Sequence, residues 1–293
     1  MIVKNYIPLT YIIKKVWASF LSVLLFSTLI FYVSKYIELP VIPVSIPAFL
    51  GTSISLVLAF KMNQAYDRWW EARKIWGEIV NDSRTLIIQL LSFSNNDMIT
   101  KPLAKRQIAW CYALSGSLRN TNVNTTIEKF IDADELKTFN KYSNLPLALL
   151  NKHSEDIRDL HNQHEINDYQ QIQLDDTLLR LNAAMGKAER IKNTVFPTSY
   201  KLYLHLFIFL FIGMLSISLV GIDGIWEILL SFLISIPFLI LEKASNLLQD
   251  PFENKPTDTA MTSISKTIEI NIKQLIGDND IPEVEENNKF YIL

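Results

Sequence analysis

Residues 202–222 read LYLHLFIFLFIGMLSISLVGI, and this stretch decides the fold class. Its only titratable side chain is His205. A helix of about 20 apolar residues is long enough to cross the hydrocarbon core of a bilayer, which is about 30 Å thick. The sequence therefore predicts an integral membrane protein in which this stretch is a transmembrane helix.

Three further stretches without charged clusters bring the expected number of spans to four. The first covers residues 16–34 and the second 39–60. Three prolines in the second favour a helix start near Ile46 or Pro47, because proline suits a first helical turn and breaks a helix interior. The fourth stretch, 225–241, has a shorter uninterrupted core, and the tight turn at 221–224 that pairs it with the third stretch supports its crossing.

The composition excludes several classes of function. The chain of 293 residues has 28 basic and 30 acidic side chains, whereas nucleic-acid binding needs clustered, uncompensated Lys and Arg. The single cysteine, Cys111, excludes an internal disulfide and a multi-thiolate metal site. His161 and His164 lack the order and the third ligand of a metalloprotease motif. We expect no enzyme activity, no bound metal and no cofactor.

The basic residues predict the orientation of the spans. Loops that keep Lys and Arg near a span tend to remain cytoplasmic, and of the 28 basic residues only Lys35 falls in an expected outer loop. We therefore expect a multi-pass protein of the bacterial inner membrane with both termini in the cytoplasm. The expected organisation is an N-terminal segment with spans one and two (1–60), a cytosolic helical region (61–200), spans three and four (201–241) and a cytosolic tail (242–293).

The middle region shows helical rather than strand patterning. The second span is expected to continue into it as one helix and to end at the polar residues 95–97. Further helices are expected at 106–118, 162–194 and 263–276, with connections at 120–126 and 142–146. The fold class predicted is all-α.

Two stripes of residues, each with its members four positions apart, run along the second span. Gly51, Ser55 and Ala59 form a small-residue stripe, and such stripes let helices approach closely in lipid. The neighbouring stripe consists of Thr52, Leu56 and Phe60. If several copies packed through the small stripe, the second would form stacked rings around a shared axis, an apolar constriction of the kind that gates by dewetting. The pattern alone leaves open that both stripes pack within one subunit.

A dense aromatic and charged cluster follows the second span. Its members are Asp67, Arg68, Trp69, Trp70 and Glu71. Trp beside Arg at the end of a span is typical of a membrane interface. We expect this cluster to be structural, with Asp67 pairing with Arg68 or with a neighbouring subunit.

Several local runs of residues follow one another along the chain in a recognisable order. They are Ile46-Pro47 opening the second span, Ala59-Phe60 closing it, the run Arg68-Trp69-Trp70-Glu71, the run 189–194 followed by Pro197 and Tyr200, Asp250-Pro251-Phe252, and the tail run 266–271. Together these runs resemble the bestrophin family in its bacterial branch. The resemblance covers nearly the whole chain in the right order.

The resemblance implies a homopentamer with one central ion pathway, embedded in the lipid bilayer and permeated by monovalent ions. In that family the neck of the pathway is lined at every-fourth spacing, which maps onto Thr52, Leu56 and Phe60. Thr52 departs from the apolar residue usual there, and its hydroxyl should make that ring easier to wet. A second, cytosolic aperture maps near Leu178, with Ile172 as the other candidate.

The resemblance gives less direct expectations about the permeating ion and about its regulation by calcium. The animal calcium clasp needs a run of acids where residues 253–258 contain a Lys and a Pro, so we expect no such clasp. The resemblance implies chloride or other anions, with a sodium or potassium channel as a close variant that the acidic tail favours. The alternative from another class is a non-conducting membrane scaffold whose cytosolic helices bind a partner protein.

Overall fold

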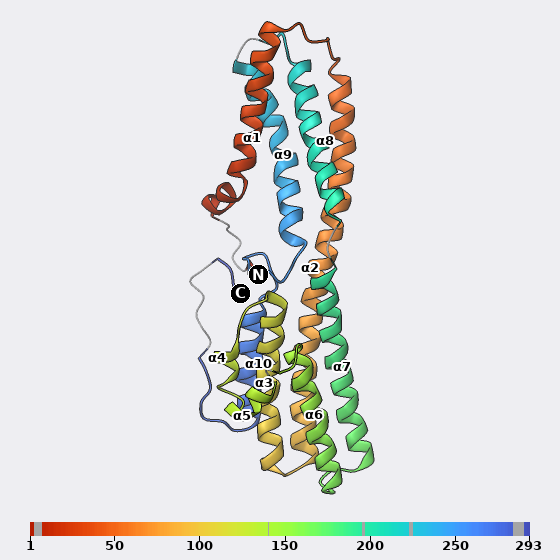
Figure 1. Cartoon of the computed structure of the whole chain (residues 1–293), viewed down its shortest axis with the longest axis vertical. Coiled ribbons are helices and arrows are strands. Elements are labelled where there is room, and N and C mark those ends of the chain that lie inside the picture. The colour runs from red at the N-terminus through yellow and green to blue at the C-terminus, as the bar shows by residue number, and fades with distance from the viewer. Residues whose placement is uncertain (3–7, 140, 195–196, 223–224, 284–289) are drawn as a thin grey trace. The chain divides into compact units, whose positions relative to one another are not determined.

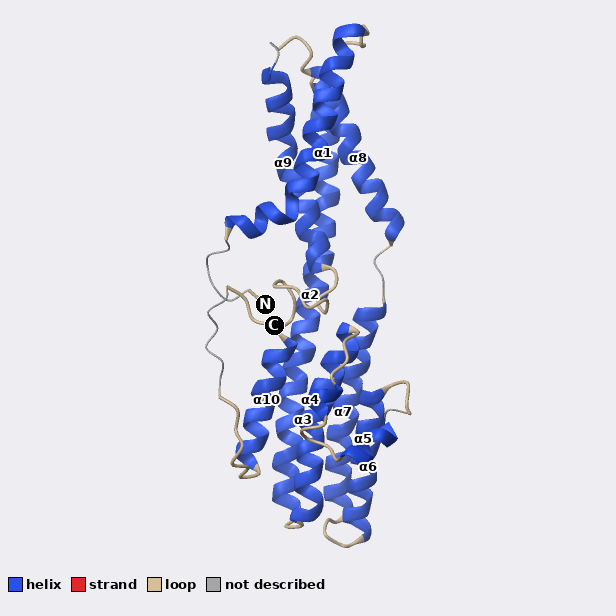
Figure 2. Ribbon diagram, turned by 60° about the vertical axis from the view of Figure 1, so that its left-hand side comes forward, coloured by secondary structure: helices blue, strands red, loops and turns tan. Residues whose placement is uncertain are grey.

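The computed structural model describes residues 1–2, 8–139, 141–194, 197–222, 225–283 and 290–293. Part of the expected turn at 221–224 and the acidic residues of the tail within 284–289 lie outside this description. Apart from two isolated β-bridges, every regular element in the described residues is a helix (Figures 1 and 2). The helices are α1 (Leu9–Tyr36), α2 (Ser45–Phe93), α3 (Asp97–Arg119), α4 (Asn124–Ile127), α5 (Ala133–Phe139), α6 (Leu145–Asn162), α7 (Asp168–Asn193), α8 (Thr198–Ser218), α9 (Ile225–Leu248) and α10 (Met261–Leu275). The all-α prediction is confirmed.

The chain divides into two compact units. The span unit comprises Lys4–Trp69 and Val195–Gln249, and the polar unit comprises Met1–Val3, Trp70–Thr194 and Asp250–Leu293. Helix α2 contributes its first part to the span unit and its second part to the polar unit. The predicted continuation of the second span into a long helix is thus confirmed.

Among the residues that the structure describes, four helices are long and apolar enough to cross a membrane, namely α1, α2, α8 and α9. Their mutual contacts form the core of the span unit, in which Val23, Ile54, Leu58, Ile208 and Ile212 are buried. Helix α2 approaches α8 at Gly51, where an added Cβ would lie 3.1 Å from Cε2 of Phe211. A side chain at this position would force the phenylalanine ring to shift.

The ends of two span helices differ from the limits of the apolar stretches. Helix α8 begins four residues before the apolar stretch and ends four residues before its last residue. Helix α9 continues seven residues beyond Leu241, through Glu242 and Asn246. Hydropathy marks where a helix is apolar, whereas its length also depends on polar contacts that the later residues make with neighbouring helices.

The polar unit is a helical bundle around one apolar core. The second part of α2 lies beside α3, α6, α7 and α10 in both ribbon views (Figures 1 and 2). Trp76, Trp110, Leu149, Leu181 and Ile268 are among its fully buried side chains. Amphipathic helices in a bundle bury one apolar face and leave the other polar.

Helix α6 lies where the sequence predicts no helix, so this part of the prediction is wrong. The connection expected at 142–146 is shorter, and α6 occupies Leu145–Asn162, before the helix expected at 162–194. The Asn144 side chain caps its start by accepting a hydrogen bond from the Leu147 amide at 3.0 Å, and Pro146 lies in the first turn. Asn144 and Pro146 are residue types common in loops, which is why the sequence predicts a connection here, but the same types are typical of a helix N-terminus.

Candidate pore-lining site

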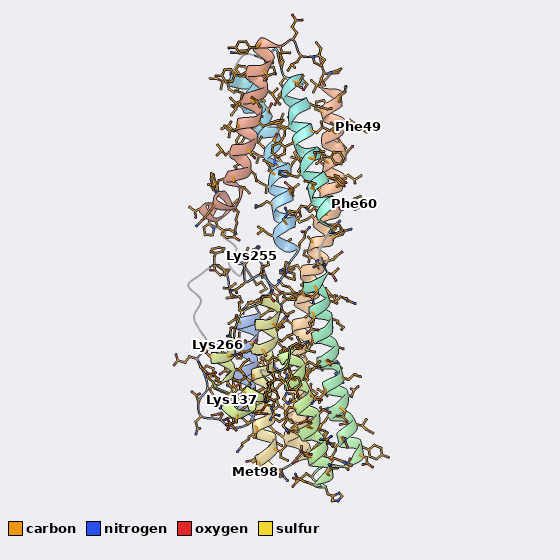
Figure 3. The ribbon with its side chains drawn as sticks, viewed as in Figure 1. Phe49, Phe60, Met98, Lys137, Lys255 and Lys266 are labelled. Carbon is orange, nitrogen blue, oxygen red and sulfur yellow. The ribbon has the colours of Figure 1, made fainter. Side chains whose placement is uncertain are left out.

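The neck stripe, defined as Thr52, Leu56 and Phe60, lies on the exposed side of α2 within the span unit. Leu56 is 59% exposed and Phe60 58% exposed, whereas Leu58 between them is buried. Figure 3 shows Phe60 on the side of α2 turned away from the other span helices. The stripe is therefore available to line a pathway between copies of the chain.

The polarity of the stripe is low even at Thr52. The Thr52 hydroxyl donates a hydrogen bond to the Ala48 carbonyl oxygen at 3.0 Å, so its proton is already used within the helix. Its oxygen lone pairs remain able to accept a hydrogen bond from water. Thr52 thus offers an acceptor in an otherwise apolar stripe.

The small-residue stripe divides between two environments. Gly51 is buried against α8, while Ser55 and Ala59 are exposed in the single chain. The Ser55 hydroxyl is bonded to the Gly51 carbonyl oxygen at 2.8 Å and adds little free polarity to that surface. Close packing through Ser55 and Ala59 against another copy remains a prediction.

A buried polar group that sequence reasoning missed follows the neck stripe directly. Lys61 is fully buried, and its Nζ donates a hydrogen bond to Oδ1 of Asn246 at 2.9 Å. Nearby, Nδ1 of His205 lies 3.2 Å from Oε1 of Glu242. The sequence signals were a lysine adjoining an apolar span and two polar residues, 242 and 246, one helical turn apart.

Several members of the aromatic and charged cluster after the second span make defined contacts. Nε of Arg68 donates to the Gln249 carbonyl oxygen at 2.9 Å, which ties α2 to the end of α9 within the span unit. The rings of Tyr66 and Trp69 lie 6.0 Å apart. Asp67, also in the span unit, has an exposed side chain. In the polar unit, Glu71 pairs with Lys74 at 2.6 Å, and the side chain of Trp70 is exposed. The structural role expected for the cluster remains a prediction.

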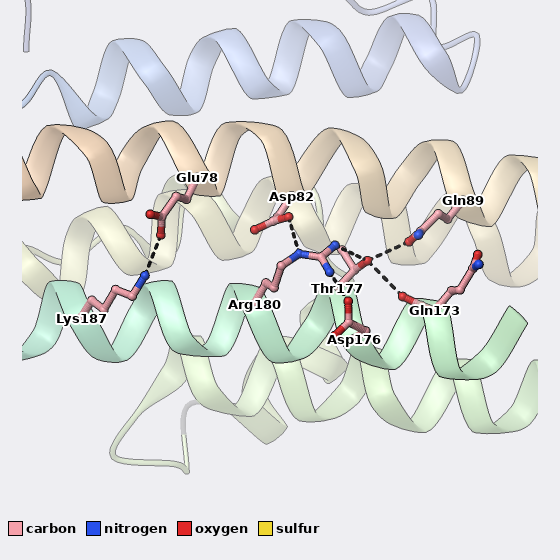
Figure 4. A network of polar contacts seen from close by, with 8 residues as sticks. All are labelled: Glu78, Asp82, Gln89, Gln173, Asp176, Thr177, Arg180 and Lys187. Atoms are coloured by element: carbon pink, nitrogen blue, oxygen red, sulfur yellow. Dashed lines mark hydrogen bonds and ion pairs between the residues drawn. The ribbon is translucent and has the colours of Figure 1, made fainter. Parts of the chain in front are cut away.

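In the polar unit, α2 and α7 are joined by charged and polar contacts (Figure 4). Lys187 pairs with Glu78 at 3.0 Å, and Arg180 pairs with Asp82 at 2.8 Å and also with Asp176. The Thr177 hydroxyl donates to Oε1 of Gln89 at 2.9 Å. These contacts hold α7 against α2 within the polar unit.

The two aperture candidates lie in opposite environments on α7. Ile172 is 64% exposed, and Leu178 is 8% exposed within the core of the polar unit. A side chain that lines an aqueous pathway must reach the surface of its own subunit. Ile172 satisfies that condition in the single chain, whereas Leu178 is buried there. Both assignments to the aperture stay predictions, and the exposure favours Ile172.

The described residues include no group of three or more potential metal ligands. His161 is instead held by Asp168, with Nε2 and Oδ1 2.7 Å apart. Burial raises the pKa of the Cys111 thiol to about 12, so this cysteine is protonated at neutral pH and is a poor nucleophile.

The fold and the exposed stripe define a class, that of helical membrane proteins, with four candidate spans in the described part of this chain. The family model described as "Bacterial/Fungal Bestrophin protein" matches residues 7–274. The chain belongs to this bestrophin family, as the sequence resemblance predicted.

Curated relatives extend the comparison. The chain is 30% identical over 271 residues to the voltage-dependent anion channel-forming protein mll4386 of Mesorhizobium japonicum, covering 91% of this chain and 86% of the relative. It is 29% identical over 236 residues to the voltage-dependent anion channel-forming protein YneE of Escherichia coli K12, and the match covers 80% of this chain and 77% of the relative. These relatives are named for anion channels.

Solved structures support the fold. The chain matches the crystal structure of a bacterial bestrophin homolog from Klebsiella pneumoniae with a TM-score of 0.83 at 24% identity. The match covers 89% of this chain and 98% of that chain. The helical arrangement described above is therefore that of a bestrophin.

Proposed function

We propose that this chain assembles into a homopentameric channel for small monovalent ions in the bacterial inner membrane, with both termini in the cytoplasm. The observation that carries the proposal is the neck stripe, whose Leu56 and Phe60 face away from their own bundle in a chain of the bestrophin family. A single subunit with four spans encloses little space. A pathway is therefore best formed between symmetric copies around one axis.

The neck stripe supplies the gate in this proposal. Rings of Leu56 and Phe60 would form an apolar constriction that water leaves readily, and ions cross such a constriction only when it widens or wets. Thr52 lowers that barrier at one end of the stripe. Ile172, exposed on α7, would line a second constriction in the polar unit.

The ion is proposed to be chloride or a similar anion, because the curated relatives are named voltage-dependent anion channel-forming proteins. A sodium or potassium pathway is the close variant, since an apolar neck by itself does not choose a sign of charge. Neither version requires a metal, a cofactor or a catalytic residue.

Two measurements on the purified full chain test the proposal. Crosslinking in mild detergent should give a ladder ending at five, and a species that remains monomeric would contradict it. In a planar bilayer under a salt gradient, exchange of sodium, potassium and chloride in turn should show which ion sets the reversal potential. A pentamer without current, even from Phe60→Ala, would instead support the non-conducting scaffold.

A further inference from the structure

Three helices of the span unit meet in a polar cluster directly beyond the neck stripe. Lys61 on α2 follows Phe60 and points into the bundle, where its ammonium group donates to Asn246 on α9 at 2.9 Å. Glu242 lies four residues before Asn246, on the same face of α9, and interacts electrostatically with Lys61. Both Lys61 and Glu242 are buried. A buried charge is stable when another charge balances it, and these two balance each other.

The third member of the cluster, His205, contacts the carboxylate of Glu242. Nδ1 of His205 on α8 lies 3.2 and 3.3 Å from the two carboxylate oxygens of Glu242. An ionised carboxylate only accepts hydrogen bonds, so Nδ1 carries the proton and donates it. Because Nδ1 faces Glu242, Nε2 is the ring nitrogen that a further proton would occupy, and half of the His205 side chain is exposed in the single chain.

The remaining surroundings of His205 add one exposed charge. Lys201 lies one turn earlier on α8, at the surface, and also interacts with Lys61. Helix α1 contributes Phe26 and Ile30 to an apolar groove of about 740 Å³ that His205 also lines. The ring of Phe209 lies 5.0 Å from the imidazole ring. Glu242 is thus the acidic group that contacts His205, and Lys61 is the cation behind it.

We propose that Lys61, Glu242 and His205 form a proton-responsive charge cluster that sets the ratio of anion to cation permeability at the neck. This inference rests on the proposed function, because it requires ions to pass Phe60. Lys61 and Glu242 are specificity-determining residues, and His205 makes the specificity depend on pH.

The mechanism needs only one proton from solvent. With His205 neutral, Lys61 and Glu242 cancel and the charge cluster has no net charge. When Nε2 binds a proton, the hydrogen on Nδ1 stays in place and is still donated to Glu242. No other bond breaks, and the net charge of the cluster becomes plus one. Lys61 and Glu242 are buried, and buried charges are weakly screened by salt. The added proton on His205 offsets the negative charge of Glu242 and leaves the positive charge of Lys61, which adjoins Phe60, to act on ions at the neck. Acidification therefore favours anions and disfavours cations.

The test is the reversal potential of the full chain in a planar bilayer under a potassium chloride gradient at pH 5.5 and 7.5. In the wild type, the anion-to-cation permeability ratio should rise by about threefold or more on acidification. Lys61→Met should lower the ratio at both pH values, and Glu242→Gln should raise it at pH 7.5. His205→Gln should hold the ratio at its neutral value across the range.

Opposite shifts from two neighbouring residues distinguish a charge effect from a packing effect. Lys61→Arg keeps the charge and should preserve the wild-type ratio, and Lys243→Met removes a charge next to Glu242 but outside the cluster and should change little. Lys61→Gln provides a second neutral variant if Lys61→Met is not monodisperse. Shifts of the same sign in Lys61→Met and Glu242→Gln, or a persistent pH response in His205→Gln, would overturn this inference alone. Absence of current from the wild type and from Phe60→Ala would overturn the proposed function as well.

Discussion

At the scale of the residue, Thr52 shows how one atom changes the character of the neck stripe. Its hydroxyl proton is bonded to the Ala48 carbonyl oxygen, and only its lone pairs remain for water. Valine has nearly the same shape and no acceptor. The residue therefore separates the effect of polarity from the effect of width.

We predict that Thr52→Val lowers single-channel conductance, because an apolar ring is harder to wet. Thr52→Ser keeps the hydroxyl and provides the matched control, which should conduct at least as well as the wild type. Single-channel recording at fixed pH measures both. A conductance in Thr52→Val equal to that of the wild type would show that the hydroxyl has no part in wetting the neck.

A second residue-scale feature is a buried histidine in the polar unit. His153 is fully buried, and its Nε2 lies 3.1 Å from Oε1 of Gln107, whose amide donates to the Ser83 hydroxyl at 2.8 Å. Burial, and then the nearby Arg106 charge, hold the pKa of His153 well below 6.5. Nδ1 has no hydrogen-bond partner among the described residues, so nothing there favours the protonated form.

We predict that the polar unit loses stability on acidification through His153. The folded state keeps this side chain neutral, while the unfolded chain binds a proton below about pH 6.5. The stability is complete above that pH and falls as the pH decreases towards the depressed folded pKa, at up to about 1.4 kcal/mol per pH unit. Denaturant unfolding of the full chain in detergent at pH 7.5, 6.0 and 5.0 measures this. His153→Gln should show a shallower pH dependence, and an equal slope would contradict the prediction.

At the scale of the element, two glycines in helices of the polar unit offer opposite environments. At Gly116 in α3, an added Cβ would lie 2.7 Å from both Cγ atoms of Val123 and 3.0 Å from the Thr121 carbonyl oxygen. At Gly186 in α7, nothing lies within 4 Å of the added atom. The same substitution therefore has opposite consequences in the two helices.

We predict that Gly116→Ala destabilises the chain by about 1–3 kcal/mol, because the turn after α3 must move to relieve the overlap. Gly186→Ala should stabilise it by about 0.5–1 kcal/mol, because alanine loses less backbone freedom in a helix. Apparent melting temperatures of the two variants in the same detergent compare them. Equal shifts, or a lower melting temperature for Gly186→Ala, would contradict the packing described for these helices.

The sequence predicted the elements better than their ends and contacts. Four apolar stretches sufficed for the spans, since length and hydropathy determine what can cross a membrane. The extension of α9 to Leu248 was not predictable from hydropathy, because Glu242 and Asn246 are held there by His205 and Lys61 from two other helices. For the same reason the charge cluster was missed. The neck stripe was visible as a pattern, but only the structure places Leu56 and Phe60 on an exposed face.

At the scale of the whole molecule, the chain combines a span unit and a polar unit that share helix α2. The family assignment was within reach of the sequence because its landmarks are local runs of residues. The sequence alone does not distinguish Ile172 from Leu178 as the aperture candidate, because the difference in their exposure depends on which side of α7 faces the core of the polar unit. The proposed pentamer joins these observations, since only several copies would turn an exposed stripe into a lined pathway.

The most direct test of this account is the single-channel conductance of neck variants in a planar bilayer. Leu56→Ala and Phe60→Ala should each raise conductance by about twofold or more, because smaller side chains widen an apolar constriction and ease its wetting. Phe207→Ala removes an exposed phenylalanine of α8 and is the matched control, for which we expect the wild-type conductance. Wild-type conductance in both neck variants would contradict the assignment of this stripe as the neck of an ion channel.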